Sequence, residues 1–151
     1  MSMDNIFGIA GTAINAQLTR MNATASNLAN AGTVATTEQD AFRAKRPVFK
    51  ALMDSQMTHN GAPYVGGVKI DRMADDTAPP RRVSDPNNPL ADKDGYVYQT
   101  NVSEVTEMVE MMAAARSYQN NVEVINTARQ LMMRTLDISK VEGRVKDRDE
   151  C

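Results

Sequence analysis

The chain has 151 residues, a length that suits one ordinary domain. Its formal net charge is -2. A charge so close to zero argues against a surface dedicated to nucleic acid or to an anionic membrane. The single cysteine, Cys151, excludes an internal disulfide framework. No apolar run approaches the roughly 20 residues that a membrane-spanning helix needs.

The first 20 residues lack the positive start and the sustained apolar core of a signal peptide. Composition alone therefore indicates a cytoplasmic protein. Aromatic residues make up only 5% of the chain, whereas methionine occurs 11 times. Methionine side chains adapt to irregular gaps, so this apolar surface suits packing that other chains complete.

Residues 1–33 are predicted to form a long coiled-coil helix. Small and apolar residues recur there at alternating steps of three and four, namely Phe7, Gly11, Ile14, Leu18, Met21, Ala25 and Leu28. The flanking positions are rich in alanine, which would let a neighbouring helix approach closely. Asn30 and Gly32 tolerate the left-handed conformation and are expected to end the helix.

Residues 34–100 contain all six prolines and are predicted to form a small antiparallel β region. Strands are expected at 46–52, 67–73, 81–84 and 95–99. The turn signals between them are Asn60-Gly61, Gly66-Gly67, Pro79-Pro80 and Asp94-Gly95. The apolar content is too thin for an independent core, so we expect this region to lean on the upper part of the C-terminal helix.

Residues 101–140 are predicted to form a second coiled-coil helix that packs with residues 1–33. Its stripe consists of Met108, Met111, Ala115, Tyr118, Val122, Ile125, Arg129, Met132 and Leu136. Asn101, followed by Glu104, is the expected N-cap. Arg129 either snorkels from the edge of the stripe or, if enclosed, requires a carboxylate partner.

The fold class predicted is therefore mainly α, with two terminal helices and a short β-rich middle segment. The charged tail, residues 141–151, is expected to be disordered. Pairing the two helices buries only one stripe, so the remaining apolar faces predict assembly with other subunits.

Candidate chemistry is sparse. His59 lies beside a predicted turn, with no nucleophile or third group placed by the sequence. Asp92 and Asp94 resemble part of a calcium loop, but Leu90 and Asn101 occupy the positions of its first and last ligands. The sequence predicts no enzyme, no cofactor and no metal site.

Several stretches resemble bacterial flagellar axial proteins, the family of rod, hook and hook-associated subunits. The first is ASNLANAGT at 25–33, which follows IAGTAINAQLTRMN. FRAKRPVF at 42–49, GGVKI at 66–70 and the block from 85 to 139 ending in RSYQNNVEVINTARQLMMRTLDIS resemble the short proximal-rod subunits. The chain departs from that pattern at Gln99-Thr100, where a proline is common, and in its extra residues after Lys140.

This resemblance implies a structural subunit of the basal-body rod, which spans the periplasm and transmits motor torque to the hook and filament. It implies terminal helices lining a helical tube, a β region facing outward, and export in an unfolded state by the flagellar type III apparatus without a cleaved signal peptide. The implied partners are copies of the chain itself, FlgB, FlgF, the distal rod protein FlgG and the adaptor FliE, with no nucleic acid and no membrane insertion.

The expected assembly interface consists of the two stripes together with Asn27 and Asn30. These two asparagines either end the first helix or pack between subunits. The competing interpretation is a soluble helical-hairpin adaptor or chaperone of a type III secretion system, which would form a small closed oligomer.

Overall fold

The computed structural model describes residues 3–52, 57–59, 62–64 and 66–149. Two helices enclose seven short strands in the sequence: α1 (Met3–Ala29), β1 (Val34–Ala35), β2 (Lys45–Ala51), β3 (Met57–His59), β4 (Ala62–Tyr64), β5 (Val68–Asp75), β6 (Arg81–Ser84), β7 (Tyr96–Gln99) and α2 (Glu104–Asp149). The prediction of two long helices with small antiparallel β elements is confirmed.

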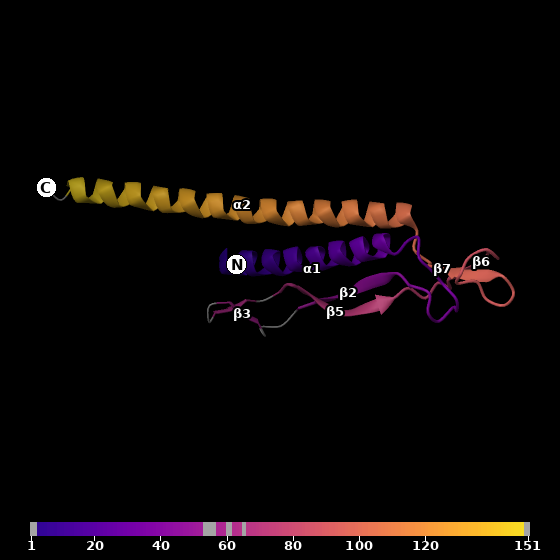
Figure 1. Ribbon diagram of the computed structural model, residues 1–151. Helices are drawn as coiled ribbons and strands as arrows, with labels where there is room; N and C mark the ends of the chain where they lie inside the picture. The colour runs from indigo at the N-terminus through magenta and orange to yellow at the C-terminus, as the bar shows by residue number, and fades with distance from the viewer. Residues whose placement is uncertain (1–2, 53–56, 60–61, 65, 150–151) are drawn as a thin grey trace.

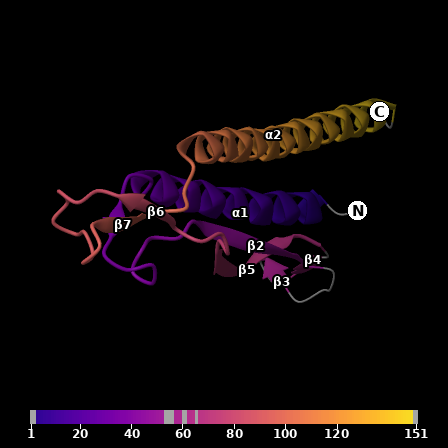
Figure 2. The ribbon, with the colours of Figure 1, turned by 90° about the vertical axis from the view of Figure 1, so that its right-hand side faces the viewer.

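The molecule is elongated and has α1 at its centre (Figure 1). The two helices run antiparallel, and the β2–β5 pair lies on the opposite side of α1 from α2 (Figure 2). The prediction that the β region leans on α2 is therefore wrong, because the helix that its strands mainly contact is α1. The buried side chains of α1 are mostly alanines, which let both neighbours approach closely.

Gly66 and Gly67, which directly precede β5, lie close to α1. Gly67 has a φ of 134°, and a Cβ added to it would lie 2.9 Å from Oγ1 of Thr12. The next residue, Val68, donates its backbone N–H to the same hydroxyl oxygen over 3.2 Å. This approach needs both a glycine conformation and the absence of a side chain.

All strand pairs are antiparallel. β2 pairs with β5 from Lys45↔Asp75 to Ala51↔Val68, with a bulge between Val48 and Phe49. β7 lies between β1 and β6, and β3 pairs with β4. Strands β2, β5, β6 and β7 begin and end within two residues of the predicted strands. The predicted Asn60-Gly61 turn lies outside the described residues.

The first helix ends directly before Asn30, in agreement with the prediction, whereas the cap of the second helix differs from the predicted one. α1 ends at Ala29, and the Asn30 side-chain amide donates to the Ser26 carbonyl over 2.8 Å, while Gly32 has no positive φ. α2 begins at Glu104, but its cap is Ser103, whose carbonyl accepts from the Glu107 N–H over 2.9 Å. The side chain of Asn101 is used elsewhere.

Asn101 joins two loops instead of capping α2. Its Oδ1 accepts from the Ala44 N–H over 2.9 Å, and its Nδ2 donates to the Ala78 carbonyl over 2.8 Å. The Asn101 cap prediction is therefore wrong, because Asn101 lies three residues before the start of α2 and both ends of its side-chain amide bind tertiary partners. The result is a fixed connection between the entry to β2 and the entry to α2.

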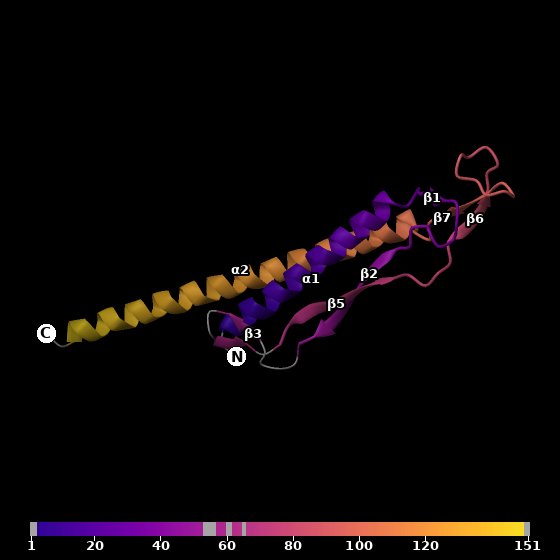
Figure 3. The same ribbon diagram turned by 60° about the horizontal axis from the view of Figure 1, so that its bottom comes forward.

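α2 continues to Asp149, where the sequence predicted a disordered tail from residue 141. The tail contains no proline, and glutamate, lysine and arginine have high helix propensity, which outweighs Gly143. The result is a long projection of α2 past the start of α1 (Figure 3). Among the described helices, neither is long and apolar enough to cross a membrane.

Candidate assembly interface

The face of α2 that meets α1 is a row of small and polar residues. Glu107, Ala114 and Ala128 are buried, and Asn121, at the same seven-residue spacing, is half-buried. The predicted stripe was chosen for its apolar character and is displaced from this row by one residue at four positions. Those four are Met108, Ala115, Val122 and Arg129, whereas Met111, Tyr118, Ile125 and Met132 flank the observed contact and are half-buried.

The predicted stripe on α1 is also not the part of the helix that is most deeply buried in the single chain. The buried positions of α1 are Ala10, Ala16, Ala23, Thr24 and Asn27. In contrast, Phe7, Ile14, Met21, Leu28 and Asn30 are half-buried, and Ala25 is exposed along with Leu18, of which 46% is accessible. The assignment of these residues to an assembly interface stays a prediction.

Large apolar side chains lie outside and small ones lie inside. Among the described residues, the fully buried apolar side chains are eight alanines and Val97. The exposed large apolar residues on α2 are Val105, Met108, Val109, Met112, Val124, Leu131, Met133, Leu136 and Ile138. Large exposed apolar patches are rare on monomeric soluble proteins and are typical of interaction surfaces.

Four residues form a polar joint where α1, β2 and α2 meet: Asn27, Lys45, Arg46 and Glu107. Asn27 is 1% exposed. Its Oδ1 accepts from the Lys45 N–H over 2.7 Å, and its Nδ2 donates to the Lys45 carbonyl over 2.9 Å and to Glu107 Oε2 over 3.0 Å. Asn27 therefore has a role inside the chain that neither alternative anticipated.

Glu107 is the largest fully buried side chain of the joint, at 0% exposure. Its Oε1 lies 3.1 Å from Nη2 of Arg46, but no N–H points at this oxygen well enough for a hydrogen bond. The contact is therefore an ion pair held by charge. Arg46 also faces Asp76, with 3.5 Å between Nε and Oδ2. Glu107 also lies in the first turn of α2, where the helix dipole favours its negative charge.

Sequence reasoning treated Glu107 only as an acidic residue near a helix start. The signal that could have found it is its place in the seven-residue row with Ala114 and Ala128, where a charged side chain must meet a specific partner. A second ion pair, Arg20 with Glu110, links the two helices at a part-exposed position. Such exposed pairs contribute about 0–1 kcal/mol, so it aligns the helices more than it stabilises them.

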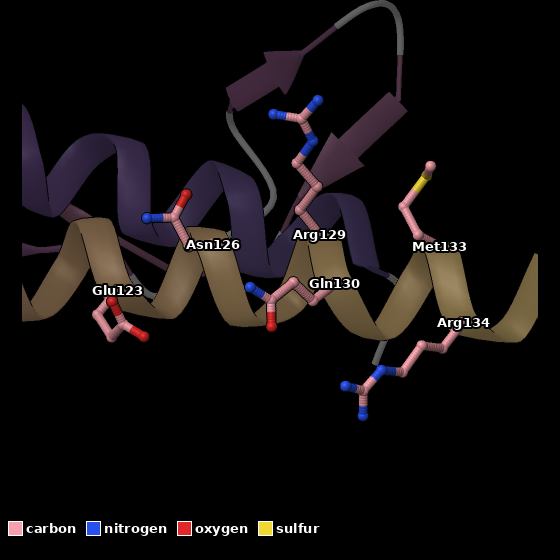
Figure 4. A pocket seen from close by; sticks show the side chains of 6 residues that line it. All are labelled: Glu123, Asn126, Arg129, Gln130, Met133 and Arg134. Carbon is pink, nitrogen blue, oxygen red and sulfur yellow. The ribbon is translucent and has the colours of Figure 1, made fainter.

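Two surface grooves involve α2. A groove of about 300 Å³ lies where Met3 and Ile6 of α1 meet Val124 and Leu131 of α2. A larger one, of about 520 Å³, is lined by α2 alone, with Arg129 and Met133 extending to one side and Arg134 to the other (Figure 4). Arg129 is exposed, so the chain's own packing requires no carboxylate beside it.

Asp92, the first aspartate of the segment that resembles a calcium loop, instead holds the backbone of its own loop. Oδ1 of Asp92 accepts the backbone N–H groups of Tyr96 and Asp94, each over 2.9 Å. The Tyr96 N–H, followed by the Asp94 N–H and the charge of Arg82, lowers the pKa of Asp92 below its ordinary value of 3.8, although desolvation opposes the shift. In the described part of the chain, no group of three His, Cys, Asp or Glu residues could hold a metal ion.

Comparison with known proteins places this sequence in a family. The pattern described as "Flagella basal body rod protein" matches residues 7–34, and "Flagellar basal body rod FlgEFG protein C-terminal" matches residues 93–138. A curated flagellar basal-body rod protein FlgC from Yersinia enterocolitica is 47% identical over 141 residues, covering 93% of this chain and 100% of the relative. The chain belongs to the FlgC family of flagellar basal-body rod proteins.

Two further FlgC proteins support the assignment. The relative from Escherichia coli O6:H1 is 46% identical over 142 residues, and that from Salmonella typhimurium is 44% identical over 142 residues. Each alignment covers 93% of this chain and the whole relative. The first matched pattern covers most of α1, and the second covers β7 and the part of α2 that exposes large apolar residues. Nothing in these comparisons favours the adaptor or chaperone alternative.

Proposed function

We propose that this chain is a structural subunit of the flagellar rod, which polymerises through α1 and α2. The observation that carries the proposal is the inverted distribution of apolar residues, with alanines packed inside and large side chains exposed on α2. Burying that surface against neighbours stabilises an assembly by roughly 25 cal/mol per Å² of apolar area. The work is mechanical and requires no chemistry from the chain.

In this proposal the subunit belongs to the proximal part of the rod, in the periplasm, and transmits torque from the motor toward the hook and filament. The two helices form a coiled coil with neighbouring subunits, and the β elements face outward. The partners are further copies of the chain and other basal-body rod proteins, specifically FlgB, FlgF, FlgG and FliE. The flagellar type III apparatus exports the unfolded chain without removing a signal peptide.

Leu18→Asp tests the predicted stripe on α1. Leu18 is 46% exposed, so this change should leave the free energy of unfolding of the single chain within about 0.5 kcal/mol of wild type. In the assembly, however, a charge would be buried without a partner, so rods should not form and cells should not swim. Swimming is measured in soft agar, and basal bodies are counted by electron microscopy.

Asn87→Asp is the matched control, because Asn87 is exposed and already polar but lies in the loop between β6 and β7, away from both helices. It should assemble and support swimming. Normal swimming of the Leu18→Asp variant would contradict the role given to this stripe.

A further inference from the structure

The two helices differ in length, and the difference leaves one end of α2 uncovered. α1 has 27 residues and α2 has 46. Met3 and Ile6 line a groove with Leu131, so α1 begins level with that part of α2. Residues 132–149 then extend for about 27 Å beyond α1 (Figures 1 and 3). We call these residues the overhang.

The overhang begins with large apolar side chains on more than one side of the helix. Met133 is 58% exposed and Ile138 is 67% exposed. These two residues are five positions apart, which places them about 140° from each other around an α-helix. A helix that is apolar around its circumference is normally enclosed, so the start of the overhang needs cover from other elements.

The overhang also continues the surface that α1 occupies. The intramolecular row Ala114, Asn121 and Ala128 extends at the same spacing to Thr135, another small residue, which lies past the start of α1. A helix of a second molecule can therefore lie along α2 in line with α1, at a similarly close distance. The row of small residues that α1 contacts thus continues into the overhang.

On α1 one side is left open for such a contact. Residues facing α2 and the β2–β5 pair are buried, whereas Asn15, Leu18, Asn22 and Ala25 are exposed and follow one another at steps of three and four. We propose that the overhang of one copy docks on this open side of α1 in a second copy. The inference rests on the proposed function and names the contact through which copies join.

The two surfaces are different, so the contact is heterologous. Each molecule presents an overhang at one place and an open α1 side at another. Repetition of a heterologous contact produces an open helical polymer or a ring, whereas a self-complementary patch produces a closed dimer. A rod requires the first kind of contact.

Cysteine cross-linking tests the docking in the full-length chain. Leu18→Cys and Ile138→Cys are combined with Cys151→Ser in one polypeptide. Arg20 pairs with Glu110, so Leu18 lies level with that region of α2 and about 40 Å from Ile138 of the same molecule. A disulfide between positions 18 and 138 must therefore join two molecules. Basal bodies from cells that produce only this variant are oxidised and analysed on denaturing gels.

The expected result is a ladder of covalent dimers, trimers and higher species. The pair Leu18→Cys with Arg116→Cys is the control, because Arg116 is exposed on α2 but lies before the overhang; it should give no ladder. If the variant is present in basal bodies but gives no 18–138 ladder, the docking is overturned and the proposed function is unaffected. Dimers from Ile138→Cys alone at equal yield would also overturn it.

Absence of the wild-type chain from purified basal bodies would instead contradict the proposed function. Docking is then decided by the same oxidation on concentrated purified protein. A ladder supports the contact, and monomers alone overturn it.

Discussion

At the scale of single residues, Asn27 carries the connection between three segments. Its side chain satisfies both backbone groups of Lys45 and one oxygen of Glu107 while being 1% exposed. No other residue of its size could donate twice and accept once in this geometry. The asparagine therefore fixes β2 and α2 against the last turn of α1.

Asn27→Ala should lower the free energy of unfolding by about 2–4 kcal/mol, because it leaves the Lys45 backbone groups and Glu107 without their partner. Urea denaturation followed by circular dichroism measures the change. Asn22→Ala, on the exposed side of the same helix, should shift stability by less than about 0.5 kcal/mol. Equal stability of the two variants would contradict the role of the joint.

Asp92 gives the loop between β6 and β7 a pH dependence. Because hydrogen bonds from Tyr96 and Asp94 lower its folded-state pKa below 3.8, its contribution to stability is present above the unfolded pKa and is lost as pH falls through the folded value. The loop should therefore loosen only below about pH 4. NMR spectra of the Tyr96 amide between pH 6 and 2.5 measure this.

Asp92→Asn provides the comparison, since it keeps an oxygen that can accept hydrogen bonds but cannot titrate. Its loop should respond less to acid over the same range. An amide shift of Tyr96 that titrates identically in both proteins would show that another group is responsible.

At the scale of elements, α2 consists of a part supported by α1 and a part without that support. Residues 104–131 lie against α1, whereas the overhang extends past it. Isolated helices of about 12–15 residues are marginal in water, so most of the stability of a helix comes from packing. The two parts should therefore differ in dynamics although both are helical.

In the dilute single chain, amide hydrogens of residues 140–149 should exchange at least tenfold faster than those of 107–128. Hydrogen exchange with mass spectrometry measures both segments in one experiment. The proposed docking predicts that the difference shrinks in purified basal bodies, where a neighbour would cover the overhang. Equal protection along α2 in the dilute chain would contradict this account.

The elements also show what the sequence could predict. Helix starts, strand positions and the antiparallel β arrangement follow from local signals such as proline, glycine and apolar period. The row of α2 that meets α1 did not follow, because Met108 is more apolar than Glu107 and a pattern search selects the more apolar row. In this chain, Met108 is exposed and most of the apolar row is only half-buried. The burial of Glu107 is explained by its polar partners, Asn27 and Arg46.

The same limit applies to the caps and the β layer. Asn101 and Ser103 are both good cap residues, and only the positions of Ala44 and Ala78 decide between them. Likewise, the preference of β2 and β5 for α1 depends on alanines whose neighbours lie far away in sequence. Contacts of this kind are set by tertiary structure and leave no local signal.

At the scale of the whole molecule, the small core predicts an unusual thermodynamic signature. An ordinary globular chain of 151 residues unfolds with a heat-capacity change of about 1.8–2.3 kcal/mol/K. That change scales with apolar surface exposed on unfolding, and here the fully buried apolar side chains of the described residues are alanines and Val97. The single chain should therefore fall below this range.

Differential scanning calorimetry at several pH values measures the heat-capacity change of the dilute protein. The control is a monomeric domain of similar length with a core of large aliphatic residues, which should fall within the usual range. A value for this chain above about 2 kcal/mol/K would mean that it hides its apolar surface without neighbours.

The loop between β6 and β7, residues 85–95, lies at the end of the molecule farthest from the C-terminus of α2 (Figures 1 and 3). This has a practical bearing on where the protein can carry an added label. A short epitope joined to either terminus would sit beside the helices that the proposed assembly uses. An insertion between Asn87 and Asn88 would project from the opposite end and leave the helices accessible, which makes it the preferred site for imaging the subunit in living cells.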